Sequence, residues 1–114
     1  MTLYNNLPVY KISYDLLLNL FKFSNSFSRD YRYTLGENIK KEVINLISNI
    51  YFCNREIEGR KEKIVQALKT TENIRLYLRL LKDLKQINLK KFIILNEQIE
   101  SISKQLIAWH RSCS

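Results

Sequence analysis

Arginines and aromatic residues alternate between residues 27 and 37, and this mixture could bind a polyanion. Arg29 and Arg32 interleave with Tyr31 and Tyr33. Guanidinium groups pair with phosphates, and tyrosine rings can stack on bases, so the segment is suited to nucleic acid. The same two rings could instead pack the segment onto the end of a helix. We favour packing, because burial is the commoner use of aromatic side chains.

Further lysines and arginines share helical faces or stand early in predicted helices. Arg75, Arg79 and Lys82 are spaced at i, i+4 and i+7, which places them on one face. Lys40 and Lys41 stand early in a helix, where the dipole does not favour cations, so an external anion explains them better. The candidate nucleic-acid-binding or partner-binding residues are Arg29, Arg32, Lys40, Lys41, Arg75, Arg79, Lys82 and Lys85. Phosphates and acidic residues of a protein partner remain alternative ligands for the arginines.

The overall charge also favours an anionic partner. The chain has 19 Lys and Arg against 11 Asp and Glu, a net charge of +8, and a pI of about 9.6. Nucleic acid is the first expectation, ahead of an acidic protein surface or an anionic membrane. The alternative is that the charge serves solubility alone.

No group of residues in the sequence suggests catalysis or metal binding. His110 is the only histidine, and no spacing typical of a metal-ligand set occurs. Gly36 and Gly59 do not form a phosphate-binding loop. Cys53 could be a redox thiol, but a buried, inert cysteine is the favoured interpretation. We therefore expect no enzymatic activity, no catalytic residue, no metal and no cofactor.

Four helical segments must position the cations. Apolar residues recur at helical spacing over about residues 8–23, 34–54, 58–84 and from Asn88 to near the C-terminus. The connections are short, which predicts antiparallel neighbours. The expected fold is all-α, an antiparallel up-down-up-down four-helix bundle that forms a single domain over residues 1–114.

Local signals predict where the helices begin. Pro8 suits a first helical turn, because its missing N–H has no helical partner there. Thr34 and Glu37 have the spacing of a capping box, so a helix is expected to start at Thr34. Asn88 is the predicted N-cap of the last helix.

The first and third segments are apolar around more of their circumference than one bundle requires. A bundle helix needs an apolar stripe somewhat over 100° wide, and large exposed apolar patches are uncommon on monomers. The polar residues of the first segment form a narrow line of Lys11, Asp15, Asn19 and Lys22. We expect a homo-oligomer to cover the surplus apolar surface. The alternative is a wide core within one chain.

Neither a membrane span nor a secretion signal is expected. No apolar run approaches the roughly 18 residues that a span requires. The N-terminus lacks the basic region and apolar core of a signal peptide. The two cysteines are not clustered, which favours a reduced cytoplasmic setting.

Four pieces of the chain, taken in order, match a family signature. They are Pro-Val-Tyr-Lys at residues 8–11, Phe-x-Arg-x-Tyr-Arg-x-Thr-Leu-Gly at 27–36, Leu-x-Leu-Arg-Leu-Leu-Lys-Asp-Leu at 76–84, and a last helix that contains Trp109. Together they resemble the accessory variability determinant (Avd) proteins of diversity-generating retroelements. The bundle proteins encoded within ribosomal-RNA intervening sequences are similar, but only the first two residues of their Asn-Ile-Ala-Glu-Gly run occur here, at residues 49–50. The family's Gly-Trp near the C-terminus appears as Ala108-Trp109.

The resemblance implies an assembly and a role. Avd proteins form homopentamers, a barrel around a central channel with a basic surface. They associate with the retroelement reverse transcriptase, bind RNA or DNA, and support template-RNA-dependent mutagenic cDNA synthesis without being the polymerase. The alternative is a structural or protein-docking oligomer of the intervening-sequence type, without a retroelement role.

Overall fold

The computed structural model describes residues 7–113, and this part of the chain is helical without any strand. The four long helices are α1 (Pro8–Ser24), α3 (Leu35–Arg55), α4 (Arg60–Asp83) and α5 (Leu89–Ser112). A one-turn helix, α2 (Arg29–Arg32), lies between the first two long helices. The expected all-helical bundle is confirmed, and the predicted ends of the helices lie within a few residues of the observed ones.

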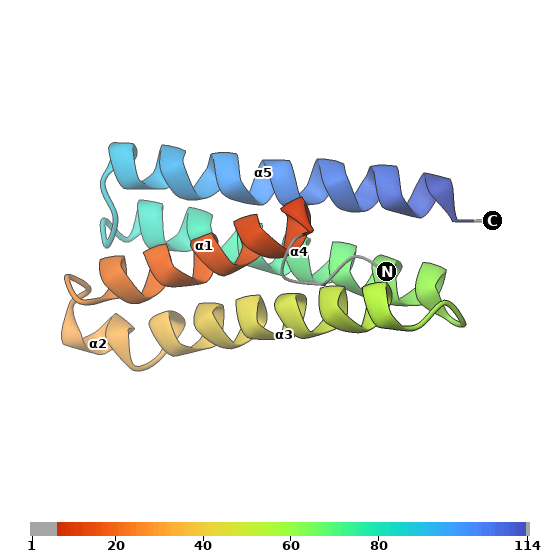
Figure 1. Cartoon of the computed structure of the whole chain (residues 1–114). Coiled ribbons are helices and arrows are strands. Elements are labelled where there is room, and N and C mark those ends of the chain that lie inside the picture. Colours follow the sequence, from red (N-terminus) through yellow and green to blue (C-terminus); the bar gives the residue numbers. More distant parts are fainter. Residues whose placement is uncertain (1–6, 114) are drawn as a thin grey trace.

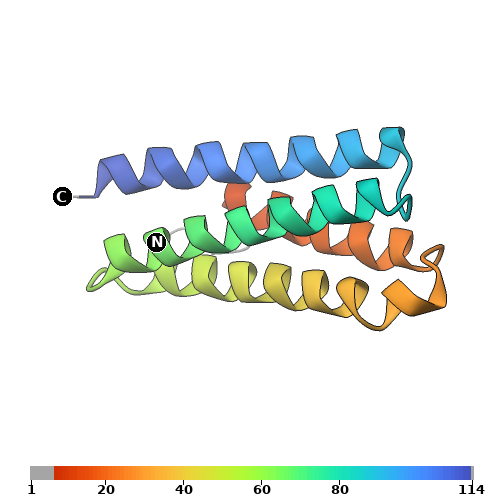
Figure 2. The same cartoon turned by 180° about the vertical axis from the view of Figure 1, so that it is seen from behind.

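The long helices lie side by side in a rod with extents of 44 × 20 × 20 Å (Figure 1). α1 packs against α3 and α5, and α4 packs against the same two helices, so α1 and α4 are diagonal to each other. The connections α1–α3 and α4–α5 lie at one end of the rod, and the α3–α4 connection lies at the other (Figure 2). We call these the α2 end and the opposite end.

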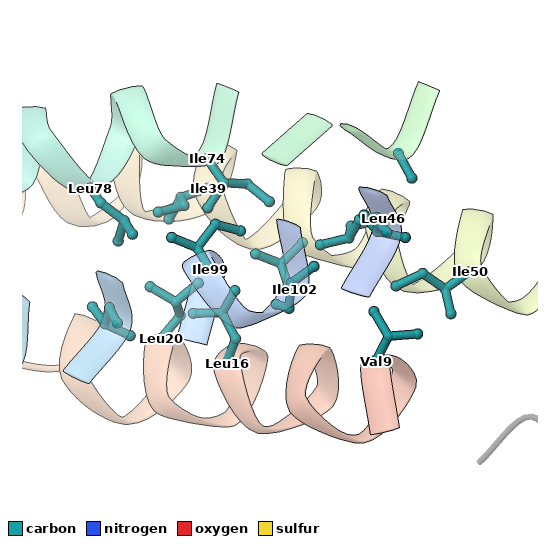
Figure 3. Packing of buried hydrophobic residues seen from close by; sticks show 14 of the residues in the cluster. Val9, Leu16, Leu20, Ile39, Leu46, Ile50, Ile74, Leu78, Ile99 and Ile102 are labelled. Carbon is teal, nitrogen blue, oxygen red and sulfur yellow. The ribbon is translucent and has the colours of Figure 1, made fainter. Parts of the chain in front are cut away.

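Each long helix points a row of aliphatic side chains into the space between the four. The best buried residues recur at intervals of three or four, which is the period of one helix face. Figure 3 labels Leu16 and Leu20 of α1, Ile39 and Leu46 of α3, Ile74 and Leu78 of α4, and Ile99 and Ile102 of α5, all of them fully or almost fully buried. Burying one such side chain contributes about 1.5–3 kcal/mol, so this core holds the helices together.

Two predicted helix starts are confirmed. Pro8 occupies the first turn of α1. Asn88 is the N-cap of α5, and its Oδ1 accepts a 2.8 Å hydrogen bond from the backbone N–H of Lys91. One orphan donor of the helix end is thereby satisfied.

The helix start predicted at Thr34 is confirmed, because Thr34 is the N-cap residue of α3 and α3 begins at Leu35. The predicted capping box is wrong, because the side chain of Thr34 caps no backbone N–H. Its hydroxyl instead donates a 2.8 Å hydrogen bond to the carbonyl oxygen of Asp30. The unexpected turn of α2 places that carbonyl four residues earlier, within reach of the hydroxyl, so Thr34 closes α2 instead of capping α3.

The α1–α3 connection packs closely onto the start of α3. The ring of Phe27 is buried. A Cβ on Gly36 would lie 3.3 Å from that ring and 3.3 Å from the carbonyl oxygen of Tyr31. Glycine therefore permits the close approach of α2 to α3. Ser28 ties this connection to the α4–α5 connection, because its N–H donates a 2.7 Å hydrogen bond to Gln86 Oε1.

Candidate functional site

Most of the net positive charge lies at the α2 end. We define this end as the two connections and the nearest seven residues of each long helix, about 10 Å of rise, which gives residues 18–41 and 77–95. It contains ten Lys and Arg against three Asp and Glu, or +7 of the net +8. By the same definition, the opposite end contains six Lys and Arg against three Asp and Glu, and the middle of the rod contains three Lys and Arg against five Asp and Glu. Only the fold reveals this polarity, because the two ranges are far apart in the sequence.

Five of the ten cations at the α2 end are available to a ligand. They are exposed, and within residues 7–113 their side chains make no ion pair or hydrogen bond. These are Lys22, Arg29, Lys41, Lys85 and Lys90. Arg79 is nearly as available, because 79% of its side chain is exposed and its nitrogen lies 3.8 Å from Asp83. An exposed pair of that length contributes little.

Three other lysines at the α2 end lie over phenylalanine rings. The distances from nitrogen to ring centroid are 4.4 Å for Lys40 over Phe21, 4.8 Å for Lys82 over Phe92 and 5.1 Å for Lys91 over Phe23. Such a contact contributes about 0.5–1 kcal/mol at an exposed site, and about 2 kcal/mol or more where the cation is desolvated. These contacts offset part of the repulsion among ten cations gathered at one end.

Two of the predicted site residues have structural partners there. The guanidinium of Arg32 donates hydrogen bonds of 2.9 Å and 3.3 Å to the carbonyl oxygens of Asn25 and Phe27, so it braces the α1–α3 connection. Lys40 is largely buried against Phe21 and lies 3.7 Å from Glu37. The charges of both residues still contribute to the field of the α2 end.

Arg75 lies outside the α2 end. Its guanidinium pairs with Glu100 of α5, and its Nε lies 3.3 Å from Glu72. Helical spacing places it on one face with Arg79 and Lys82, but spacing could not show a partner 25 residues away. The structure therefore divides that face into an internally paired arginine and two residues of the α2 end.

The α2 end also includes three cations that were absent from the predicted set, Lys22, Lys90 and Lys91. Lys22 lies in the last turn of α1, and Lys90 and Lys91 lie in the first turn of α5. A count of charges at each end of the expected bundle would have found all three, because short connections bring those turns together.

Lys85 has a backbone conformation that disfavours lysine. Its φ is 60°, in the left-handed region, where an L side chain costs about 1–2 kcal/mol. Lys85 follows α4 in a Schellman motif. The N–H of Gln86 donates a 2.8 Å hydrogen bond to the carbonyl oxygen of Leu81, and the N–H of Lys85 donates a 3.0 Å hydrogen bond to the carbonyl oxygen of Lys82. Glycine is usual at this position. The chain therefore holds an exposed cation where its backbone is strained.

The remaining candidates for chemistry are structural. Cys53 is fully buried, and this burial raises the pKa of its thiol from 9.0 to about 11. The interpretation as an inert, buried cysteine is therefore supported. At the opposite end, Arg60 and Trp109 border a pocket, but Arg60 donates to the carbonyl oxygens of Cys53 and Asn54 at the end of α3. Within residues 7–113, no group of three potential metal-ligating side chains gathers.

No helix within residues 7–113 combines the length and the apolar composition that a bilayer span requires.

Fold and charge together define a class of protein, a small four-helix bundle with one strongly basic end. A family model described as bAvd-like matches residues 8–113. The chain belongs to the bAvd-like family, and the resemblance to Avd proteins is confirmed. A comparison with curated proteins finds no match.

Proposed function

We propose that this protein is a non-enzymatic accessory protein that binds nucleic acid and associates with a retroelement reverse transcriptase. In that role it supports template-RNA-dependent, mutagenic cDNA synthesis in the cytoplasm. Membership of the bAvd-like family supports the retroelement part of the proposal. The net charge of +7 at the α2 end supports the proposal that the protein binds nucleic acid.

The five unpaired cations give the proposal a physical basis. Lysines and arginines that neutralise phosphates release condensed counterions, so affinity falls steeply with salt. If all five contact a single strand, the slope of log K against log salt is about −3.5 for each copy of the chain, from about −0.7 per phosphate. The charge of the α2 end also raises the rate of encounter with a polyanion.

We also propose that the chain, as one antiparallel bundle domain, assembles through two different apolar surfaces. The α1 stripe consists of Tyr14, Leu18 and Phe21, of which 48–52% is exposed. The α4 stripe consists of Leu76, Leu80 and Leu84, of which 36–59% is exposed. Because α1 and α4 are diagonal, the stripes face different directions. A contact between the α1 stripe of one copy and the α4 stripe of the next is heterologous, and such contacts form a ring when the rotation between neighbouring copies closes.

A ring would multiply the charge of the α2 end. Cyclic symmetry rotates every copy about one axis, so all the α2 ends lie at the same level and point the same way along that axis. The family resemblance suggests five copies. A nucleic acid that reaches from one copy to the next then binds by avidity, which strengthens binding without any new kind of contact.

The test is fluorescence anisotropy of a labelled RNA, titrated from low to physiological salt. The double variant Lys41→Ala/Lys90→Ala removes two unpaired cations from the α2 end. Its matched control, Lys61→Ala/Lys104→Ala, removes two exposed lysines elsewhere on the rod. We expect the first variant to bind about tenfold more weakly, with a slope shallower by about 1.4. Equal effects of both variants would show that the α2 end is not the binding site.

The exposed apolar stripes keep one alternative open, a structural or protein-docking oligomer without a nucleic-acid role. It predicts an intact oligomer with negligible RNA affinity at physiological salt. The association with a reverse transcriptase is tested separately, by co-expression and co-purification with a retroelement reverse transcriptase from the same source. Nuclease treatment during that purification distinguishes a direct protein contact from a shared RNA.

A further inference from the structure

Tyr33 is an exposed aromatic residue at the α2 end, and packing does not explain it. It follows the last residue of α2 and is 65% exposed. Its side chain makes no hydrogen bond or ring contact within residues 7–113. Phe27 already anchors the α1–α3 connection in the core, and Tyr31 is half-buried. The packing interpretation is therefore supported for Tyr31 and not for Tyr33.

The position of Tyr33 among unpaired cations makes it more than an isolated exposed ring. Arg29 lies four residues earlier, one helical turn away, and it is exposed without an ion-pair partner in the described chain. Residues spaced in this way across a turn lie on one side of it. Lys41 and Lys85 place further unpaired cations at the same end. The strained backbone of Lys85 shows that one of these cations is held there despite a conformational cost.

We propose that the α2 end binds an unpaired stretch of nucleic acid, with the ring of Tyr33 stacked on a base and Arg29 paired with a neighbouring phosphate. The inference rests on the proposed nucleic-acid role and specifies the form of its ligand. In a duplex both faces of each internal base are covered by its neighbours, whereas a single strand offers a free face to an aromatic side chain. Cations alone would attract either form, so the ring distinguishes them.

The size of the α2 end agrees with a short single-stranded site. The rod is 20 Å across in both directions, which matches the lower part of the range of about 4–16 nucleotides that small single-strand-binding folds cover. Stacking on an aromatic ring tolerates any base. The site would therefore bind unpaired template RNA or its cDNA with little sequence preference.

The experiment compares a labelled, unstructured 20-nucleotide RNA with the same RNA annealed to its complement. The proteins are the full-length chain and three variants. Tyr33→Ala removes the ring, Tyr33→Phe keeps it, and Phe52→Ala removes an exposed ring from the opposite end. The same sequence made as DNA shows which kind of single strand is preferred.

We expect Tyr33→Ala to weaken single-strand binding by about 5- to 160-fold, the range for loss of one stacked base. The salt slope should stay unchanged, because no phosphate contact is removed. The Tyr33→Phe and Phe52→Ala variants should bind the single strand with an affinity within twofold of that of the unmodified protein. The unmodified protein should bind the duplex more weakly than the single strand, and Tyr33→Ala should not change the affinity for the duplex. Two results would overturn this inference and leave the proposed nucleic-acid role intact. In one, Tyr33→Ala changes the affinity for single-stranded RNA by less than twofold. In the other, the unmodified protein binds the duplex as tightly as the single strand. Failure of both RNAs to bind at physiological salt overturns the nucleic-acid role with it.

Discussion

Arg75 of α4 is paired with Glu100 of α5 across the contact between the two helices, and its side chain is 30% exposed. The pair joins neighbouring helices near the middle of the rod, outside the basic α2 end. One turn later on α4, the side chain of Arg79 is 79% exposed. Two arginines of similar appearance in the sequence therefore have different roles in the structure.

Substitution of these two arginines should separate stability from binding. Arg75→Ala leaves the partly buried Glu100 without its cation, so we expect the free energy of unfolding to fall by about 1–2 kcal/mol. RNA affinity should change less than twofold. Arg79→Ala should change stability by less than about 0.5 kcal/mol and weaken RNA binding several-fold. Urea unfolding and anisotropy measure the two quantities, and the reverse assignment would contradict the location of the site.

Lys85 offers a substitution that should stabilise the protein while it weakens RNA binding. Lys85→Gly relieves the left-handed backbone, so the free energy of unfolding should rise by about 1 kcal/mol. Lys85→Ala is the matched control, because it removes the same cation but keeps a Cβ at φ 60°. Both variants should weaken RNA binding to the same extent, and only Lys85→Gly should gain stability. Equal stability of the two variants would show that the backbone at Lys85 is not strained.

The sequence predicts the four long helices of this protein well, because each has a strong apolar period. Pro8 and Asn88 mark helix starts, and the apolar period fixes the buried faces. The capping box failed at Thr34 because a turn of four residues, too short to produce a periodic pattern, offered its hydroxyl a nearer acceptor at Asp30.

The site was harder to predict than the fold. Individual cations are visible in the sequence, but their partners are not, because Glu100 and the ring of Phe92 come from another helix. The net charge of +7 at the α2 end is contributed by two ranges that are far apart in the sequence, so it is recognised only when the helices are placed side by side. The same holds for Tyr33, because the sequence does not show that Phe27 is the buried ring of this connection and Tyr33 the exposed one.

The charge of the α2 end predicts how salt affects stability. Ten cations lie within one end of the rod with only three carboxylates to offset them. The excess cations repel one another over a Debye length of about 30 Å at 0.01 M salt and about 8 Å at 0.15 M. Sodium chloride over this range should therefore raise Tm, measured by circular dichroism. Lys41→Ala/Lys90→Ala should reduce the rise, and Lys61→Ala/Lys104→Ala should preserve it. A Tm that falls with salt would mean that attractive ion pairs outweigh the repulsion.

Cys53 predicts how stability changes at high pH. Its folded pKa, about 11, is raised above the ordinary value of 9.0, so the folded state retains a proton that the unfolded state loses. Stability should therefore fall as pH rises from about 9 towards about 11. Cys53→Ala lowers stability at every pH by leaving a small cavity, so the test compares slopes. The variant should lose less stability over this window, and parallel slopes would exclude the contribution of Cys53.

The two apolar stripes predict how the copies assemble. Leu18→Glu places a charge in the α1 stripe, and Leu76→Glu places a charge in the α4 stripe. Both leucines are more than half exposed, so each variant should still fold as a monomer. Each variant alone, Leu18→Glu or Leu76→Glu, should be a monomer in native mass spectrometry.

Mixing the two variants distinguishes a heterologous contact from an isologous one. In a heterologous assembly, the intact α4 stripe of the Leu18→Glu variant binds the intact α1 stripe of the Leu76→Glu variant, because each chain retains the half that the other lacks. The mixture should then form 1:1 heterodimers that stop at two chains, since both remaining stripes carry a glutamate. An isologous α1–α1 interface behaves differently, because Leu76→Glu would then assemble alone and mixing would rescue nothing. Heterodimers that appear only in the mixture would therefore establish the directional contact from which a ring is built.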